Sequence, residues 1–263
     1  MALSNTYDTR PQLGLRQETA AGAVAQVLLL AVLGTAIGLG PLGWLTGVAF
    51  ALTTWAALTH ALSRSRPGPR SFGPANRVTL ARAVLVGGVT ALVADSFERP
   101  RPVAVLVALT TIALILDAVD GQVARRTGTT SSLGARFDME VDAFLILVLS
   151  VHVAASLGPW VLLTGAMRYG FVAAARVLPW LNGSLPPSMA RKTVAAVQGI
   201  ALLLVAADIL PRPPALATAL LALALLVWSF GRDIGWLWRA RAREAKAVVL
   251  EAEAETAREA TRV

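Results

Sequence analysis

Long apolar stretches alternate with short polar connections along most of this chain. The apolar stretches lie at residues 20–38, 41–62, 78–96, 102–119, 138–157, 159–179, 193–210 and 214–231. Each is long enough, or nearly so, for an α-helix that crosses a bilayer. The pattern predicts an all-α protein, a polytopic membrane helical bundle with about eight transmembrane helices. The polar start of the chain is followed by no small-residue cleavage site, so we expect the first span to be retained.

Composition agrees with this prediction and narrows the chemistry. Of the 263 residues, 56% are hydrophobic, and a mean hydropathy of +0.62 argues against a large soluble domain. The chain contains no cysteine, which excludes disulfides, thiolate metal sites and thiol nucleophiles. A metal site must therefore use oxygen ligands or the two histidines, His60 and His152. Each lies alone in an apolar run, and we interpret both as ordinary membrane residues rather than ligands.

The distribution of basic residues predicts the orientation in the membrane. Lys and Arg near the ends of spans stay cytoplasmic, and with the N-terminus inside, the outer loops keep only Arg99, Arg101 and Arg212. Both termini and the acidic motif described below are then cytoplasmic. The net charge of +8 is spread along one membrane face, which favours contact with the anionic lipid bilayer and no nucleic acid.

One internal boundary is visible in the sequence. Residues 64–75 are rich in Pro, Gly, Ser and Arg, a composition typical of a linker. We expect an N-terminal tail and two-span hairpin at 1–63, a cytoplasmic linker at 64–75, a six-helix membrane core at 76–233, and a charged cytoplasmic C-terminal helix or tail at 234–263.

Four acids in an apolar chain are the main chemical feature. They lie in the pattern D-x-x-D-G-x-x-A-R-x(8)-G-x-x-x-D-x-x-x-D, as Asp117, Asp120, Asp138 and Asp142. An acid in the bilayer costs at least about 2.5–3.5 kcal/mol, and converging carboxylates also repel one another unless cations lie between them. Oxygen ligands without sulfur favour Mg²⁺, Mn²⁺ or Ca²⁺, and a pair of such ions can hold a pyrophosphate. The alternative is a set of acids paired with arginines at a membrane interface.

Small and basic residues accompany the acids. Gly121, Ala124 and Gly134 leave the helix surfaces flat, with room for a planar base or a sugar, and Arg125 adds a positive charge near a phosphate. The motif therefore predicts a site for a nucleotide with a metal-bound pyrophosphate.

This run resembles, without a gap, the signature of the CDP-alcohol phosphotransferase (CDP-alcohol phosphatidyltransferase) family. The resemblance implies transfer of a phosphatidyl group from CDP-diacylglycerol to an alcohol with release of CMP. It also implies that Asp117, Asp120 and Asp138 bind two Mg²⁺ or Mn²⁺ ions with the donor pyrophosphate, and that Asp142 approaches the metals and acts as the catalytic base. Donor-binding positions implied in the same way are Asp117, Gly121, Ala124, Arg125, Gly134, Thr79 and Arg82, the last two in a segment similar to N-x-x-T-x-x-R. A homodimer is a further implication.

Cations near the predicted cavity indicate an anionic acceptor. Trp160 and Trp180 bracket a span, which puts Arg168 near mid-membrane, while Arg191 and Lys192 begin the next span. We expect these three cations to bind an acceptor phosphate.

The acceptor itself stays open between several alcohols. Residues 191–198 resemble part of phosphatidylglycerophosphate synthases, whose acceptor is glycerol 3-phosphate. Four residues depart from their pattern, namely Met139, Glu140, Met189 and Ala190. Inositol phosphate, an unphosphorylated alcohol and a second lipid remain as alternatives. A secondary transporter is the alternative from another functional class, and it predicts polar residues along several spans rather than at one depth.

Overall fold

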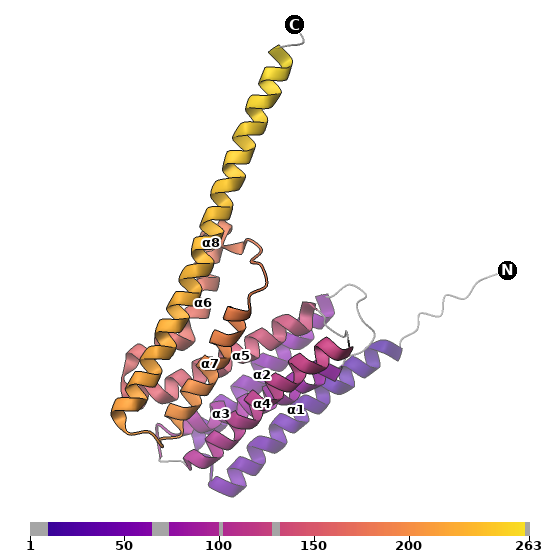
Figure 1. Ribbon diagram of the computed structural model, residues 1–263. Coiled ribbons are helices and arrows are strands. Elements are labelled where there is room, and N and C mark those ends of the chain that lie inside the picture. The colour runs from indigo at the N-terminus through magenta and orange to yellow at the C-terminus, as the bar shows by residue number, and fades with distance from the viewer. Residues whose placement is uncertain (1–9, 65–73, 100–101, 128–131, 261–263) are drawn as a thin grey trace, which may run out of the picture.

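The computed structural model describes residues 10–64, 74–99, 102–127 and 132–260 (Figure 1). Its α-helices are α1 (Arg10–Ile37), α2 (Pro41–Arg64), α3 (Pro74–Asp95), α4 (Val103–Thr127), α5 (Ser132–Leu157), α6 (Leu162–Val177), α7 (Met189–Ala206) and α8 (Arg212–Ala260). Two short 3-10 helices, η1 (Pro159–Val161) and η2 (Pro179–Asn182), flank α6. No strand occurs in the described ranges, and the all-α prediction is confirmed. Most of the predicted linker at 64–75 lies outside the described residues.

Among the described residues, six helices are long and apolar enough to cross a membrane, so the chain is a multi-pass membrane protein. The apolar part of α4, Val103–Val119, is shorter, because the acidic motif takes up the next turns of that helix. The predicted span at 159–179 consists of α6 with a 3-10 helix at each end, one containing Trp160 and the other Trp180. Beyond the predicted boundary at 233, α8 continues without a break as a single helix of 49 residues.

Helix α3 lies at the centre of the N-terminal part of the bundle. It packs against α1, α2, α4 and α5, and its span is the most deeply buried of the six. Small and β-branched side chains, among them Ala83, Val86 and Val89, are fully buried and let the neighbouring helices approach it closely. The residues that α3 carries are thus held from several sides.

The N-terminal hairpin packs along this central helix. At one end, the Gly40 backbone N–H, just before α2, donates a hydrogen bond of 2.9 Å to the buried Oδ1 of Asp95. Near the other end, Arg77 of α3 pairs with Glu18 of α1 at 2.6 Å. The ring of Phe50 on α2 also lies 5.1 Å from that of Phe144 on α5. The hairpin therefore supports two helices of the core.

Helices α6 and α7 both contact α8, and they reach the rest of the bundle mainly through α5 (Figure 1). Gly165 of α6 lies directly against the backbone of Leu147 on α5, where a larger residue has no room. Between α7 and α8, the buried amide of Gln198 donates a hydrogen bond of 2.6 Å to the Ala222 carbonyl. Helix α5 is thus the element that joins the two halves of the bundle.

Candidate active site

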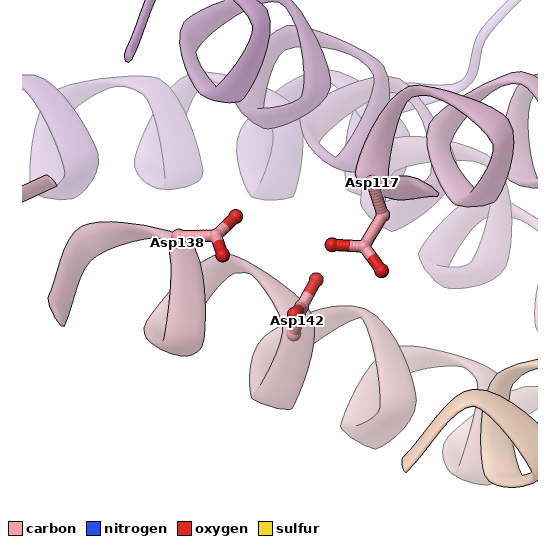
Figure 2. Close-up of side chains that lie close together, drawn as sticks. All are labelled: Asp117, Asp138 and Asp142. Atoms are coloured by element: carbon pink, nitrogen blue, oxygen red, sulfur yellow. The ribbon is translucent and has the colours of Figure 1, made fainter. Parts of the chain in front are cut away.

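Three of the four motif acids converge between two helices. Asp117 projects from α4, and Asp138 and Asp142 project from the first turns of α5, toward one another in Figure 2. One carboxylate oxygen from each lies within 4.8 Å of the others. Residues four apart lie on the same helix face, which explains why the two acids of α5 both meet α4. We call these three residues the acid triad.

A buried arginine on α3 contacts all three members of the triad. The Nη1 atom of Arg82 lies 2.9 Å from Oδ1 of Asp117, and the same guanidinium pairs with Asp138 and Asp142. The Arg82 side chain is fully buried, whereas between a third and two-fifths of each acid side chain is exposed. The arginine thus closes the protein side of the triad, and the acids keep an open side.

Packing around α3 fixes the position of Arg82. Thr79, one turn earlier on the same helix, is also buried, and α3 contacts both α4 and α5. A guanidinium presents donors in a fixed fork, so one arginine can bridge carboxylates from two helices. The local sequence therefore places a fixed positive charge where two acidic helices meet.

The charge balance of this cluster fits a divalent metal. Arg82 brings one positive charge against the three negative charges of the triad, so a negative excess remains on the open side. Carboxylate oxygens are hard ligands that suit Mg²⁺ or Mn²⁺, and oxygens within 4.8 Å of one another can share an ion. The residues present therefore fit a metal site, and Asp117, Asp138 and Asp142 are the described side chains that can hold it.

The structure describes only part of the predicted donor site. Gly121 on α4 and Gly134 on α5 lie near the triad along their helices, and Gly134 is buried. The side chains of Asp120, Ala124 and Arg125 lie outside what the structure describes, so their predicted roles stay predictions. The interpretation of the motif as two antiparallel acidic helices agrees with the course of α4 and α5.

The three predicted acceptor cations lie on two helices, Arg168 on α6 and the other two on α7. Arg168, on α6, donates a hydrogen bond of 2.5 Å from Nη2 to Oε1 of Glu140 on α5. Arg191, on α7, lies 3.3 Å from a carboxylate oxygen of Asp233 on α8, and Lys192 beside it is exposed. Arg168 and Arg191 have different partners, and their joint role in binding an acceptor stays a prediction.

Two features of these contacts are not evident from the sequence. Glu140 faces away from Asp138 by about 200° on an ideal helix, and the structure shows that it faces α6 and pairs with Arg168. Asp233 accepts from both Arg191 and Arg232, and these three residues help to line a cavity of about 210 Å³ between α8 and the segment before α7. The extra acid Glu140 inside the motif gives the sequence one hint of its pairing with Arg168. No spacing pattern indicates that Asp233 contacts two arginines.

Comparison with known families connects this geometry to a reaction class. A family model described as CDP-alcohol phosphatidyltransferase matches residues 72–230, more than half of the chain. The chain belongs to the CDP-alcohol phosphatidyltransferase family. No curated protein and no solved structure matches it. Enzymes of this family are transferases that move a phosphatidyl group from a CDP-alcohol to an alcohol.

The matched region contains the candidate site. It begins just before α3, ends inside α8, and includes Arg82 and the whole acid triad. The hairpin α1–α2 lies outside the match, as does the C-terminal part of α8. In this CDP-alcohol phosphatidyltransferase, the acid triad lies at one place between two helices. That arrangement differs from the distribution over several spans that a transporter predicts.

Proposed function

We propose that this protein transfers a phosphatidyl group from CDP-diacylglycerol to a phosphorylated alcohol, glycerol 3-phosphate, and releases CMP. The observation that carries the proposal is the convergence of the acid triad around Arg82, inside the region that matches the family. A site with this charge suits a pyrophosphate bound through divalent ions, as a CDP-linked donor requires.

The four acids hold the metal in this proposal. Asp117, Asp120 and Asp138 would hold two Mg²⁺ or Mn²⁺ ions together with the donor pyrophosphate, and Asp142, one turn further along α5 than Asp138, would also approach them. When bound, the ions supply positive charge that stabilises the leaving CMP. Arg82 holds Asp117, Asp138 and Asp142 in place from the buried side, and Thr79, Gly121, Ala124, Arg125 and Gly134 border the donor.

The proton of the acceptor goes to Asp142. The acceptor hydroxyl oxygen forms a bond to the phosphorus that carries the diacylglycerol, and the bond from that phosphorus to the CMP oxygen breaks. Asp142 takes the hydroxyl proton as this happens, a contribution of typically about 10²–10⁴-fold to the rate. Its side chain is two-fifths exposed, so a hydroxyl from outside the bundle can reach it. No covalent intermediate with the protein is needed.

The acceptor phosphate is bound by cations from α6 and α7. We assign Arg168, Arg191 and Lys192 to it, because an embedded arginine near a metal site favours an anionic substrate. Both termini and the active site face the cytoplasm in this proposal, which the distribution of Lys and Arg supports.

The test is a CMP-release assay on purified protein. CDP-diacylglycerol is incubated with Mg²⁺ or Mn²⁺ and, separately, glycerol 3-phosphate, inositol phosphate, glycerol and inositol, and the lipid product is identified by its mass. We expect CMP release, greatest with glycerol 3-phosphate, and release about 10²–10⁴-fold slower with the Asp142→Asn variant. Release with another acceptor would correct the acceptor alone, and no release with any acceptor would overturn the transferase proposal.

A further inference from the structure

One acid of the α5 motif segment lies outside the triad and contacts a different helix. Glu140 lies between Asp138 and Asp142 in sequence, but its carboxylate pairs with Arg168 of α6. The guanidinium also contacts the preceding residue, with Nη1 of Arg168 2.9 Å from the sulfur of Met139. Arg168 therefore contacts α5 at Met139 and Glu140, which lie between the two triad acids in sequence, and Glu140 is on a different face of the helix from Asp138.

The contact with Glu140 uses only one of the hydrogen-bond donors of the Arg168 guanidinium. One terminal nitrogen donates to one carboxylate oxygen, and the other contacts a thioether, which is a weak acceptor. The buried Nε atom of Arg168 has no hydrogen-bond partner among the described residues. A phosphate group, with oxygens that accept two parallel N–H bonds, suits this guanidinium better than the single contact does.

Exposure allows exchange between the two anions. More than half of the Glu140 side chain and about a quarter of the Arg168 side chain are exposed, so the pair lies at an open face rather than in the core. Exposed pairs of this kind are weak, and a ligand anion can replace the carboxylate without burying it. Glu140 also repels an anion that approaches, because its own charge stays nearby.

We propose that Glu140 is a specificity-determining residue, which occupies Arg168 and lowers the affinity of the acceptor site for phosphate. The phosphate of an acceptor must displace the Glu140 carboxylate before it binds Arg168. Glu140 thereby sets how strongly the enzyme favours a phosphorylated alcohol over an uncharged one. This inference rests on the proposed function, in which Arg168 binds the acceptor phosphate.

Two measurements on the full chain in lipid nanodiscs test it. The first is the dissociation constant of inorganic phosphate by calorimetry, which needs no turnover. The second is the KM for glycerol 3-phosphate and for CDP-diacylglycerol in the CMP-release assay. The variants are Glu140→Gln, Arg168→Gln and the double variant. Glu251→Gln is the control, because Glu251 is an exposed acid in the distal part of α8.

Removal of the Glu140 charge is expected to strengthen phosphate binding. In Glu140→Gln, the phosphate dissociation constant and the KM for glycerol 3-phosphate both fall about three- to tenfold, as the loss of a weak ion pair and of a like charge implies. The KM for CDP-diacylglycerol stays unchanged, and Glu251→Gln matches the wild type. In the Arg168→Gln background, Glu140→Gln has less than a twofold effect, since the competition needs both residues.

Other results distinguish a failure of the Glu140 role from a failure of the proposed transferase function. A phosphate affinity that stays the same or weakens in Glu140→Gln overturns the role of Glu140, even where CMP release is intact. A lower KM for the donor instead of the acceptor also overturns it, because Arg168 would then face the donor. Absence of CMP release overturns the transferase proposal, and the phosphate affinity still decides whether Glu140 competes for Arg168.

Discussion

The Arg82 guanidinium lies 2.9 Å from the Asp117 carboxylate, and it joins a fully buried side chain of α3 to the open acid cluster of α4 and α5. The same guanidinium contacts both acids of α5. One positive charge thus holds three helices together at the site. Arg82 is therefore a structural residue that also contacts every member of the acid triad.

Replacement of Arg82 is expected to destabilise the protein. Arg82→Gln leaves three converging carboxylates without the charge that links them. Loss of one partner from a buried ion pair costs roughly 3–5 kcal/mol, and partial exposure of the acids puts the expected loss below that range. The Tm in detergent should fall by several degrees, and added Mg²⁺ should recover part of the loss.

Arg77 offers a matched control for this variant. It lies on the same helix, but its side chain is 65% exposed in its pair with Glu18, so Arg77→Gln should leave the Tm nearly unchanged. Equal falls in Tm for the two variants would show that the contacts of Arg82 with the acid triad stabilise the protein no more than an exposed ion pair does.

Asp142→Asn should separate chemistry from donor binding. An amide cannot take the hydroxyl proton, so turnover should fall by about 10²–10⁴-fold. Donor binding should persist, because Asp117 and Asp138 remain. Turnover is measured as CMP release, and donor affinity by binding of radiolabelled CDP-diacylglycerol. If donor affinity falls as much as turnover, Asp142 is chiefly a metal ligand.

The contact between α5 and α6 depends on a glycine. A Cβ atom at position 165 would lie 2.5 Å from Cα of Leu147, and backbone cannot give way as a flexible side chain can. Gly165→Ala should therefore lower the Tm, although alanine is favoured over glycine in a helix by about 1 kcal/mol.

The same helix contains the control for that variant. A Cβ atom at Gly170 has no heavy atom of the described residues within 4 Å. Gly170→Ala should keep or raise the Tm. A lower Tm for Gly170→Ala than for Gly165→Ala would contradict the close packing of α6 on α5.

Asp95 should matter for stability and little for catalysis. Its buried carboxylate accepts the hydrogen bond from the Gly40 N–H, and loss of a buried acceptor costs about 1–3 kcal/mol. Asp95→Ala should lower the Tm more than Asp95→Asn, whose amide oxygen can still accept. Thirteen residues of helix, roughly 20 Å, separate Asp95 from Arg82, so kcat of the folded variants should stay close to that of the wild type. A large fall in kcat with an unchanged Tm would contradict the assignment of Asp95 to stability rather than catalysis.

The sequence was sufficient to predict the helical fold and the acid cluster. Apolar length determines which segments cross a membrane, and helical spacing puts Asp138 and Asp142 on one face, so both follow from local pattern. The contacts of Arg82 depend on how α3 packs between α4 and α5, and the spacing of residues in the sequence does not indicate that packing. For the same reason, the pairing of Glu140 with Arg168 and the sharing of Asp233 by two arginines required the tertiary structure.

The N-terminal hairpin shows a similar limit. The linker composition predicts a boundary at residues 64–75, but it does not reveal that α1 and α2 pack along α3. That packing is largely apolar, with polar contacts near its two ends between Glu18 and Arg77 and between Gly40 and Asp95, which lie 55 or more residues apart. Long-range pairs of this kind leave no periodic signal in the sequence.

The most direct test of the acid triad as a metal site is the binding of Mn²⁺ to purified protein, followed by electron paramagnetic resonance. The signal of free Mn²⁺ should decrease as wild-type protein is added, and Asp138→Asn should weaken this binding at least tenfold. Glu98→Gln should not, because Glu98 lies in the turn that follows the opposite end of α3. Equal Mn²⁺ binding by wild type and Asp138→Asn would contradict a metal site built from Asp117, Asp138 and Asp142.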